Sequence, residues 1–242
     1  MRSGMRGVSF AILILSSLAG YSQETKPDTT FLSLARKQSV SRYAAATQNQ
    51  SRLYNGSDYV YYLPKDEEHP YFKSDDWSSG SIVYWDELYE NVSILYDLSI
   101  DHVIIEHNRG NPIKLLSEKV TSFTIADHTF VRLQRGEKNK IPDGFYDQLY
   151  NGKSKVYGKY AKFYEEALES RTVIPRFDET YRYYVVRDGI FHMVKTKKSL
   201  LDVFGDRKQE IKAFLRKNHI RHNDDREKSI VRVAEFYDTL TD

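Results

Sequence analysis

The sequence predicts an α+β protein: an N-terminal helix, an antiparallel β-rich body, and a C-terminal helical segment of two or three helices. Short runs that alternate apolar and polar residues recur about every ten residues over 57–195, separated by turn-forming residues. This spacing is typical of antiparallel strands and not of βαβ units. The 19 tyrosines suit aromatic pairs across neighbouring strands. Over 196–242 the apolar period changes to that of helices, which we expect to pack on the same domain.

Residues 1–22 have the three parts of a secretory signal peptide. Two arginines give the positive start, an apolar run covers 8–15, and Gly20 and Ser22 precede a cleavage site before Gln23. The alternative is a retained membrane anchor, but the apolar run is shorter than the roughly 20 residues that a helix needs to cross a bilayer. We therefore expect export, with the mature chain in the periplasm, at the outer membrane or outside the cell.

Composition excludes several classes of function. The chain has no cysteine, so disulfides, an N-terminal lipid on cysteine and a cysteine nucleophile are impossible. The 36 basic and 34 acidic residues nearly balance, whereas a nucleic-acid-binding protein shows a basic excess. After the signal peptide no apolar run reaches membrane-spanning length, so we expect no transmembrane segment in the mature chain. No glycine-rich phosphate loop occurs, and no cofactor is expected.

The region 23–56 is expected to hold a polar lead and one helix. Residues 23–30 are polar and include a proline, as in a loosely attached lead. An apolar stripe at helical spacing then runs over 31–48, and Asn55 with Gly56 marks a turn.

The body 57–195 contains two hairpins that the pattern predicts directly. One turns over 126–128 and would place Phe123 on the same side as Val131; the other turns at Asp188-Gly189, which tolerates positive φ. Further short strands are expected at 59–63, 81–85, 94–98 and 102–107.

The segment 153–170 is ambiguous. Its tyrosines and alanines fit a helical stripe, yet its first residues are typical of a strand. We favour a long hairpin with its tip near 165–170 and a return arm over 172–177, and the helix stays the alternative.

The C-terminal segment is expected to begin with a helix over 200–204 that Ser199 caps. A second helix is expected over 206–218, and Asn223 or Asp224 would cap a third. The small surplus of basic residues here suits either a solvated helix face or contact with an anionic surface.

Three short stretches carry a resemblance: 52–56, 88–92 with 95–97 after it, and 198–201. They are similar to stretches in a group of exported proteins of Bacteroidota bacteria, in which a signal peptide ending Tyr-Ser-Gln is also typical. The resemblance implies export and a β-rich body with a helical tail. It brings no catalytic residues.

The candidate binding residues lie close together in the sequence and combine aromatic rings with carboxylates. They are Trp77, Tyr84, Trp85, Asp86, Tyr89 and Glu90. Such rings beside carboxylates suit stacking on a sugar or anchoring a protein partner, and packing in the core is the plain alternative. Neighbouring residues of a strand face opposite sides, so at most some of the six share a surface.

The sequence predicts no metal site. His102, Glu106 and His107 approach a metalloprotease motif, but the spacing is off by one and the residues between them favour a strand. On a strand His102 and Glu106 would be about 13 Å apart, too far to bind one zinc ion.

The leading hypothesis is a non-enzymatic exported module that binds a protein partner or a glycan in the cell envelope; the oligomeric state stays open. The alternative is an envelope hydrolase whose carboxylate and histidine site assembles in space. A deep pocket would favour the hydrolase if it held at least two of Asp76, Asp86, His102, Glu106 and His128. A flat aromatic surface would favour binding.

Overall fold

The chain of the computed structural model divides into two units, Met1–Ala45 and Ala46–Asp242, and the sheet and its C-terminal helices belong to the second. Residues 1–50 include the expected signal peptide, polar lead and helix, and they lie outside the described residues except for three positions with helical backbone. The structure describes Arg36, Gln38, Ser39, 52–60, 68–107, 110–136, 140–169 and 172–240.

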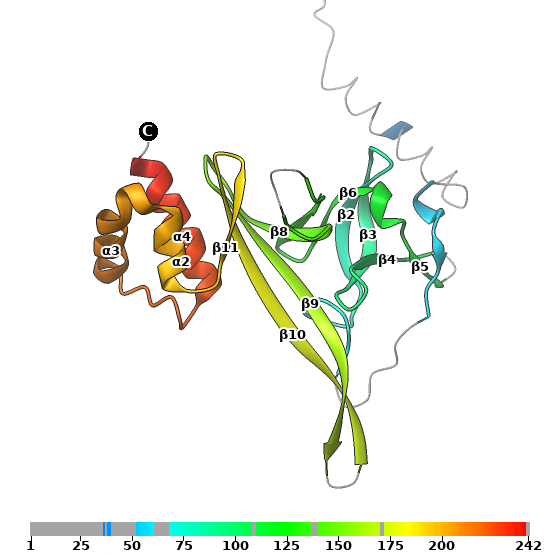
Figure 1. Cartoon of the computed structure of the whole chain (residues 1–242). Helices are drawn as coiled ribbons and strands as arrows, with labels where there is room; N and C mark the ends of the chain where they lie inside the picture. Colours follow the sequence, from blue (N-terminus) through cyan, green and yellow to red (C-terminus); the bar gives the residue numbers. More distant parts are fainter. Residues whose placement is uncertain are drawn as a thin grey trace, which may run out of the picture. The chain divides into compact units, whose positions relative to one another are not determined.

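Eleven strands in the described part of the chain form one antiparallel sheet (Figure 1). Their order is β1-β5-β4-β3-β2-β6-β7-β8-β9-β10-β11, so most neighbours in the chain are neighbours in the sheet. The strands are β1 Ser57–Asp58, β2 Ser78–Tyr84, β3 Glu87–Asp97, β4 His102–Glu106, β5 Pro112–Lys114, β6 Val120–Ile125, β7 His128–Leu133, β8 Gly144–Asn151, β9 Lys155–Glu169, β10 Thr172–Arg187 and β11 Ile190–Val194.

Strand β2 has a register irregularity against each of its two neighbours, β3 and β6. The register between β2 and β3 shifts between Gly80 and Ser81, whose partners are Val92 and Glu90. Asn91 is the extra residue of β3 and has a φ of 57°. A shift of this kind is a β-bulge, which bends a strand and increases its twist. A Cβ at Gly80 would lie 2.0 Å from the backbone oxygen of Thr124 in β6, so only glycine fits there. The N–H of Lys162 in β9 donates to Leu98 O at 3.3 Å, which brings β9 back to the end of β3.

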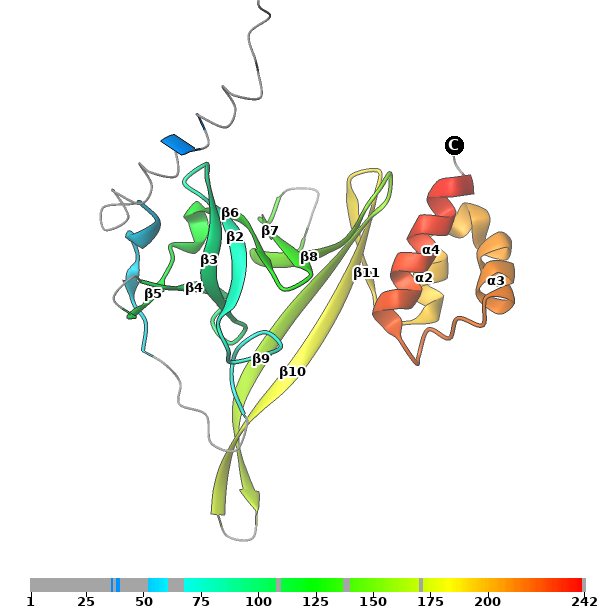
Figure 2. The ribbon, with the colours of Figure 1, turned by 180° about the vertical axis from the view of Figure 1, so that it is seen from behind.

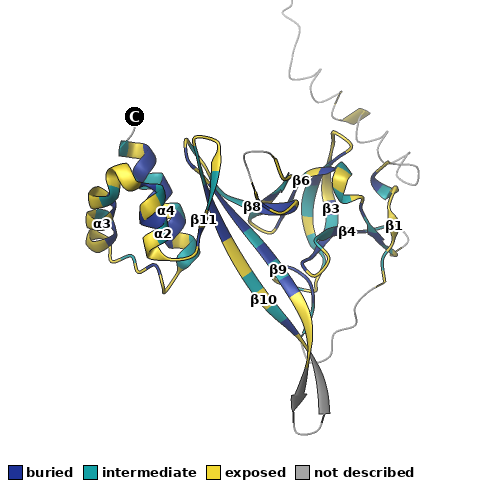
Figure 3. Ribbon diagram, viewed as in Figure 1, coloured by how far each residue is buried: buried dark blue, intermediate teal, exposed yellow. Residues whose placement is uncertain are grey.

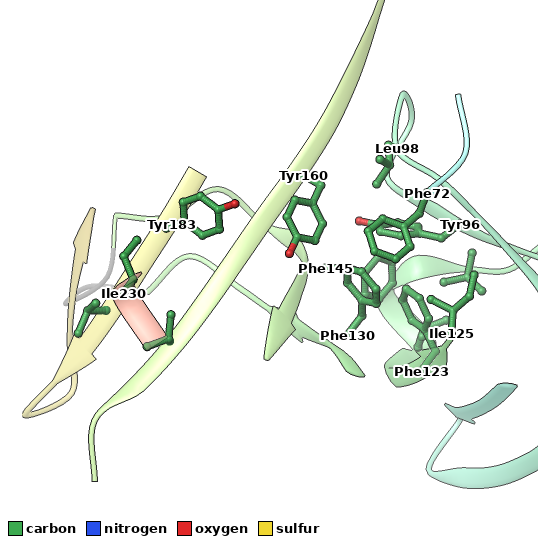
Figure 4. Packing of buried hydrophobic residues seen from close by; sticks show 14 of the residues in the cluster. Phe72, Tyr96, Leu98, Phe123, Ile125, Phe130, Phe145, Tyr160, Tyr183 and Ile230 are labelled. Carbon is green, nitrogen blue, oxygen red and sulfur yellow. The ribbon is translucent and has the colours of Figure 1, made fainter. Parts of the chain in front are cut away.

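The main core is an aromatic cluster on one face of the sheet (Figure 4). Phe123 and Phe130 stack at 4.9 Å, and Phe72 from the loop before β2 stacks on Tyr160 at 5.4 Å. Tyr96 and Phe145 complete the cluster with edge-on contacts. The rings come from five strands and one loop, so the cluster forms only when these segments are assembled.

Two smaller apolar clusters lie on the opposite face, because successive residues of a strand point to opposite sides. One contains Tyr146, Tyr157 and Tyr184, and the other contains Leu95 and Ile104. Along β9 and β10 both faces are buried near the other strands, at 156–158 and 183–185, whereas 163–166 are exposed (Figure 3). The tyrosines of the sequence are thus used on both faces of the sheet.

Three α-helices follow the sheet among the described residues: α2 Lys197–Val203, α3 Lys208–Lys217 and α4 Arg226–Leu240. They lie beside β9, β10 and β11, away from β2 to β5 (Figures 1 and 2). The buried side of α4 is apolar and joins the main core. Its members are Ile230, Val233, Ala234 and Tyr237.

Most expected elements of the body and tail are confirmed. The sheet is antiparallel, three helices follow it, and 153–170 belongs to a hairpin of β9 and β10, not to a helix. The hairpin at Asp188-Gly189 joins β10 to β11, with Gly189 at a φ of 76°.

Three local expectations are wrong. The turn between β6 and β7 has two residues, not three, so Phe123 pairs with Phe130, and Val131 lies on the opposite face. The stretch 87–92 belongs to strand β3 instead of separating two strands. Thr196, not Ser199, caps α2, although Ser199 completes the capping box.

The start of α4 and the strand expected over 59–63 also differ from expectation. Asp225 accepts the N–H of Lys228 at 2.9 Å, so α4 begins later than expected. Of the strand expected over 59–63, the described Tyr59 and Val60 lie outside any strand, and 61–63 lie outside the described residues.

Candidate functional site

The six candidate binding residues do not form one surface. Tyr84 is fully buried, and its hydroxyl donates to Asn55 O at 2.7 Å. Tyr89 packs partly buried against the main core, whereas Trp77 packs against the cluster of Leu95 on the other face of the sheet.

The remaining three residues are exposed. Trp85 and Asp86 form the turn between β2 and β3, with φ values of 53° and 61°. The ammonium of Lys119 lies 4.2 Å from the centre of the Trp85 ring, a cation–π contact. Glu90 lies further along β3, where its register partner is Ser81 of β2. The aromatic residues of the expected patch therefore form the turn between β2 and β3 or pack in the apolar clusters.

The five residues proposed for a hydrolase are not brought together either. His102 and Glu106 are the two ends of β4, and the ring of His102 contacts Ile100 O at 2.6 Å. Asp76 lies in a loop, where its N–H binds Ser74 Oγ at 3.0 Å. In the described part of the chain no group of three His, Asp or Glu residues could hold a metal ion.

His128 instead belongs to a polar network that sequence reasoning missed. Its Nδ1 contacts the carboxylate of Asp147 in β8, which is 2% exposed. Its Nε2 lies 2.6 Å from the ammonium of exposed Lys73. Asp147 also accepts the hydroxyl of Tyr160 at 3.0 Å. The network thus runs from the surface into the core.

The same hydroxyl of Tyr160 links the sheet to α4. It lies 3.0 Å from the carboxylate of Glu227, which also accepts the hydroxyl of Tyr183 at 3.2 Å. Figure 4 shows Tyr160 between the aromatic core and Tyr183. A hydroxyl has one proton, so Tyr160 donates to one carboxylate at a time. The hydrogen bonds to Asp147 and to Glu227 are therefore alternatives for this one proton.

Burial, reinforced by the neighbouring carboxylates Asp147 and Glu227, raises the pKa of Tyr160 well above its ordinary value. Burial and Glu227 likewise raise the pKa of Tyr183. Both hydroxyls therefore stay protonated and act as donors. Their hydrogen bonds to Glu227 attach α4 to the sheet.

One signal in the sequence could have indicated this network. Asp147 follows Phe145 and Tyr146 in a strand whose other residues are largely apolar or amphipathic. An acidic residue inside such a strand requires buried donors. The identity of the donors, Tyr160 and His128, depends on the register of β7, β8 and β9 and is not visible in the sequence.

The outer part of the hairpin β9–β10 is a two-stranded ribbon. β8 pairs with β9 only over Lys155–Gly158, and β11 pairs with β10 only from Tyr183 onwards. Eleven register pairs, from Lys159↔Arg182 to Glu169↔Thr172, are left without a third strand among the described strands. Figures 1 and 2 show the ribbon projecting beyond the other strands.

Two open hollows lie near the helices. One, of about 390 Å³, is lined by residues of β10, the end of β11 and the first residue of α4. The other, of about 350 Å³, lies on the helical segment and is lined by Lys197, Lys212, Leu215, Arg216 and Ile220. Neither hollow contains the network of His128 and Asp147.

The structure is thus an antiparallel sheet followed by C-terminal helices, with a two-stranded ribbon that projects from the sheet. Compared with protein-family models, curated proteins and solved structures, the chain matches none of them. Among the helices that the structure describes, none is both long and apolar enough to cross a membrane. Function is therefore inferred from the geometry of this chain alone.

Proposed function

We propose that the chain is an exported, non-enzymatic module of the cell envelope that binds a protein partner through the ribbon β9–β10. One observation carries this proposal: the ribbon extends past its neighbouring strands and exposes large aromatic side chains there. Phe163 is 50% exposed and Tyr164 is 49% exposed. Exposed rings of this size are typical of interaction surfaces.

The geometry of the ribbon favours a polypeptide as partner. Phe163 and Tyr164 are neighbours in a strand, so the ribbon presents one ring on each face. A ribbon with this arrangement suits insertion between two surfaces of a partner. Its backbone edges can also pair with a strand, which only a polypeptide supplies.

Stability gives a second reason. A two-stranded hairpin by itself is marginally stable in water. The base of the ribbon is supported, because Glu68 accepts the N–H of Phe177 at 2.7 Å and Lys162 donates to His69 O at 2.9 Å. The outer pairs, beyond Tyr164↔Phe177, lie past these contacts. A partner that covered them would stabilise them.

Site-specific crosslinking tests the proposal. A photoreactive amino acid at Phe163 is expected to give one discrete crosslinked species in the native cell envelope. The same amino acid at exposed Ala213 in α3 is the matched control and is expected to give none. Equal crosslinking at both positions, or none at Phe163, would contradict the proposal.

A shortened ribbon gives an independent check. Tyr164 and Phe177 are register partners, so replacing 165–176 by Asn-Gly closes the ribbon with a tight turn. This variant is expected to keep the circular dichroism and melting behaviour of the parent chain. It should lose the crosslinked species when the probe is placed at Phe163.

Export is supported by the positive start, apolar run and small residues of 1–22. We expect N-terminal sequencing of protein from the cell envelope to begin at Gln23. A chain that begins at Met1 in the cytoplasmic fraction would contradict export.

A hydrolase is the second candidate, favoured by the contact between His128 and Asp147, which resembles the base half of a catalytic triad. The Nε2 atom that would activate a nucleophile faces Lys73 instead. A hydrolase would turn over a chromogenic ester or glycoside and lose this activity in His128→Gln. If no substrate is turned over by the parent chain, the hydrolase is disfavoured.

A further inference from the structure

The hollow at the base of the ribbon has a mixed cationic and aromatic lining. It is formed by Tyr181, Arg182, Met193, Val194, Lys195 and Arg226. No lining residue is acidic, and among the described residues none of the three cations forms an ion pair. Tyr181 and Arg182 are neighbours in β10, so their side chains point to opposite faces, and Arg226 packs on Tyr183, which shares the face of Tyr181. Arg226 is therefore the cation that lies on the face of Tyr181, and exposed Lys195 is a second cation of the lining.

Arg226 lines the hollow and is held in place by an aromatic contact. Its guanidinium carbon lies 5.5 Å from the centre of the Tyr183 ring. Its Nε is buried and has no hydrogen-bond partner. Because this atom is closed to solvent, a ligand in the hollow would meet the terminal nitrogens of the guanidinium. A carboxylate is the ligand that matches the guanidinium fork, since its two oxygens accept two parallel N–H groups.

Tyr181 supplies a flat apolar surface next to these cations. It is 48% exposed. Its hydroxyl donates to the carboxylate of Glu179, and its ring contacts Tyr160 edge-on at 5.6 Å. These two contacts fix the orientation of the ring before any ligand arrives, which lowers the entropic cost of binding.

We propose that this hollow binds an acidic sugar, the uronic acid unit of a polysaccharide, with its carboxylate on Arg226 and its ring against Tyr181. A pyranose has a flat apolar face and a carboxylate at its edge, so one unit meets both features of the hollow. The side chain of an acidic peptide meets only the cations and leaves Tyr181 uncovered. The volume of about 390 Å³ is within the range of small-ligand sites.

This site goes beyond the protein-binding function proposed for the ribbon. Tyr181 pairs with Tyr160 at the base of the ribbon, outside the stretch 165–176. The variant with the shortened ribbon is therefore expected to bind the sugar unchanged, and the two proposals can fail separately.

Titration calorimetry with the purified protein tests the inference. The probes are a short oligouronate, the neutral oligosaccharide of the same linkage, and hexaglutamate. We expect binding of the oligouronate only. Arg226→Gln and Tyr181→Leu should each weaken it by about tenfold or more, because each removes one of the two matched contacts. Arg216→Gln, in the other cationic hollow, is the matched control and should change nothing.

Several results would overturn the proposal. They are no binding of the oligouronate, equal binding of the neutral sugar, equal binding of hexaglutamate, or an equal loss in Arg216→Gln. If Arg226→Gln is unfolded by circular dichroism, exposed Lys195 takes its place. Lys195→Gln must then weaken binding several-fold, and unchanged binding rejects the site.

Discussion

The hydroxyl of Tyr160 in β9 lies 3.0 Å from the carboxylate of Glu227 in the first turn of α4. This contact joins two parts of the chain that are 67 residues apart. Among the described residues, Glu227 is one of three carboxylates of the helical segment that accept hydrogen bonds from the β body, either from a strand or from the turn between β8 and β9. Asp206 accepts the guanidinium of Arg187 at 2.7 Å, and Asp238 accepts the N–H of Ser154 at 3.0 Å.

Tyr160→Phe tests the contact. The variant keeps the ring stacked on Phe72 but removes the donor for Asp147 and Glu227. We expect the free energy of unfolding to fall by about 1–3 kcal/mol, because buried Asp147 loses a hydrogen bond. Urea unfolding followed by circular dichroism measures it.

Tyr164→Phe is the control, since this side chain is 49% exposed and its hydroxyl donates to exposed Glu166 at 3.3 Å. Its effect should stay within about 0.5 kcal/mol. Equal losses in the two variants would show that the network contributes no stability.

Gly80→Ala should be strongly destabilising. The added Cβ would lie 2.0 Å from Thr124 O, a backbone atom that cannot move without disturbing the pairing of β2 with β6. Overpacking of this kind costs about 1–3 kcal/mol and occasionally more. Thermal melting measures it. Gly205→Ala is the matched control, because its Cβ would meet no atom within 4 Å, and we expect a change in Tm near zero.

The contact between Asp206 and Arg187 predicts a loss of stability in acid. Burial raises the pKa of Asp206, but hydrogen bonds from Arg187 and Tyr237 outweigh it, and the pKa lies below its ordinary 3.8. A carboxyl with a lowered pKa contributes stability above the pKa of the unfolded chain, and this contribution is lost as the pH falls through the folded pKa.

The measurement compares melting at about pH 7 and about pH 3. Asp206→Asn should melt at a lower temperature than the parent chain at the higher pH, and the difference should shrink at the lower pH. Asp127→Asn, which removes an exposed carboxylate in the turn between β6 and β7, is the control and should leave the parent profile unchanged. A constant difference between Asp206→Asn and the parent would contradict the prediction.

His222 predicts a second, milder transition. Its side chain is 3% exposed, and Nδ1 lies 3.2 Å from Ser229 Oγ. Burial, with the charges of Arg226 and Lys197, lowers its pKa below the ordinary 6.5. The unfolded chain therefore binds more protons just below that pH, so stability falls as the pH drops through 6.5 towards the folded pKa.

The test follows melting between about pH 7.5 and about pH 5. His222→Gln should have a flatter profile than the parent chain over this range, whatever its absolute stability. His192→Gln, at a partly exposed position of β11, should keep the parent slope. If the His222→Gln profile matches the parent slope, protonation of His222 has no role.

Local patterns explain which parts of the fold could be predicted. The alternation of apolar and polar residues predicted the hairpin at Asp188-Gly189, and the helical spacing of apolar residues predicted α4. Both signals lie within a short stretch of the sequence. The face of Val131 was predicted wrongly because a turn of two residues instead of three shifts the register by one, which turns every following side chain over.

The polar network could not be predicted for a different reason. His128, Asp147, Tyr160 and Glu227 come from three strands and a helix. Their meeting depends on strand order and on where α4 docks. The aromatic candidates near Trp85 are close in the sequence, but this proximity does not make them a shared surface. Phe163 and Tyr164 are exposed because the pairing of β8 with β9 and of β11 with β10 stops before it reaches them, and the sequence does not show where that pairing stops.

The aromatic core also constrains when the chain can fold. Phe72 packs on Phe130 and on Tyr160, so the contacts that close the core span almost ninety positions of the chain. Contacts of such long range form late and slowly, because loops must close before burial compensates them. A growing polypeptide therefore holds no completed core until β9 has been synthesised. If the chain is exported as we propose, this delay keeps it extended and competent for translocation.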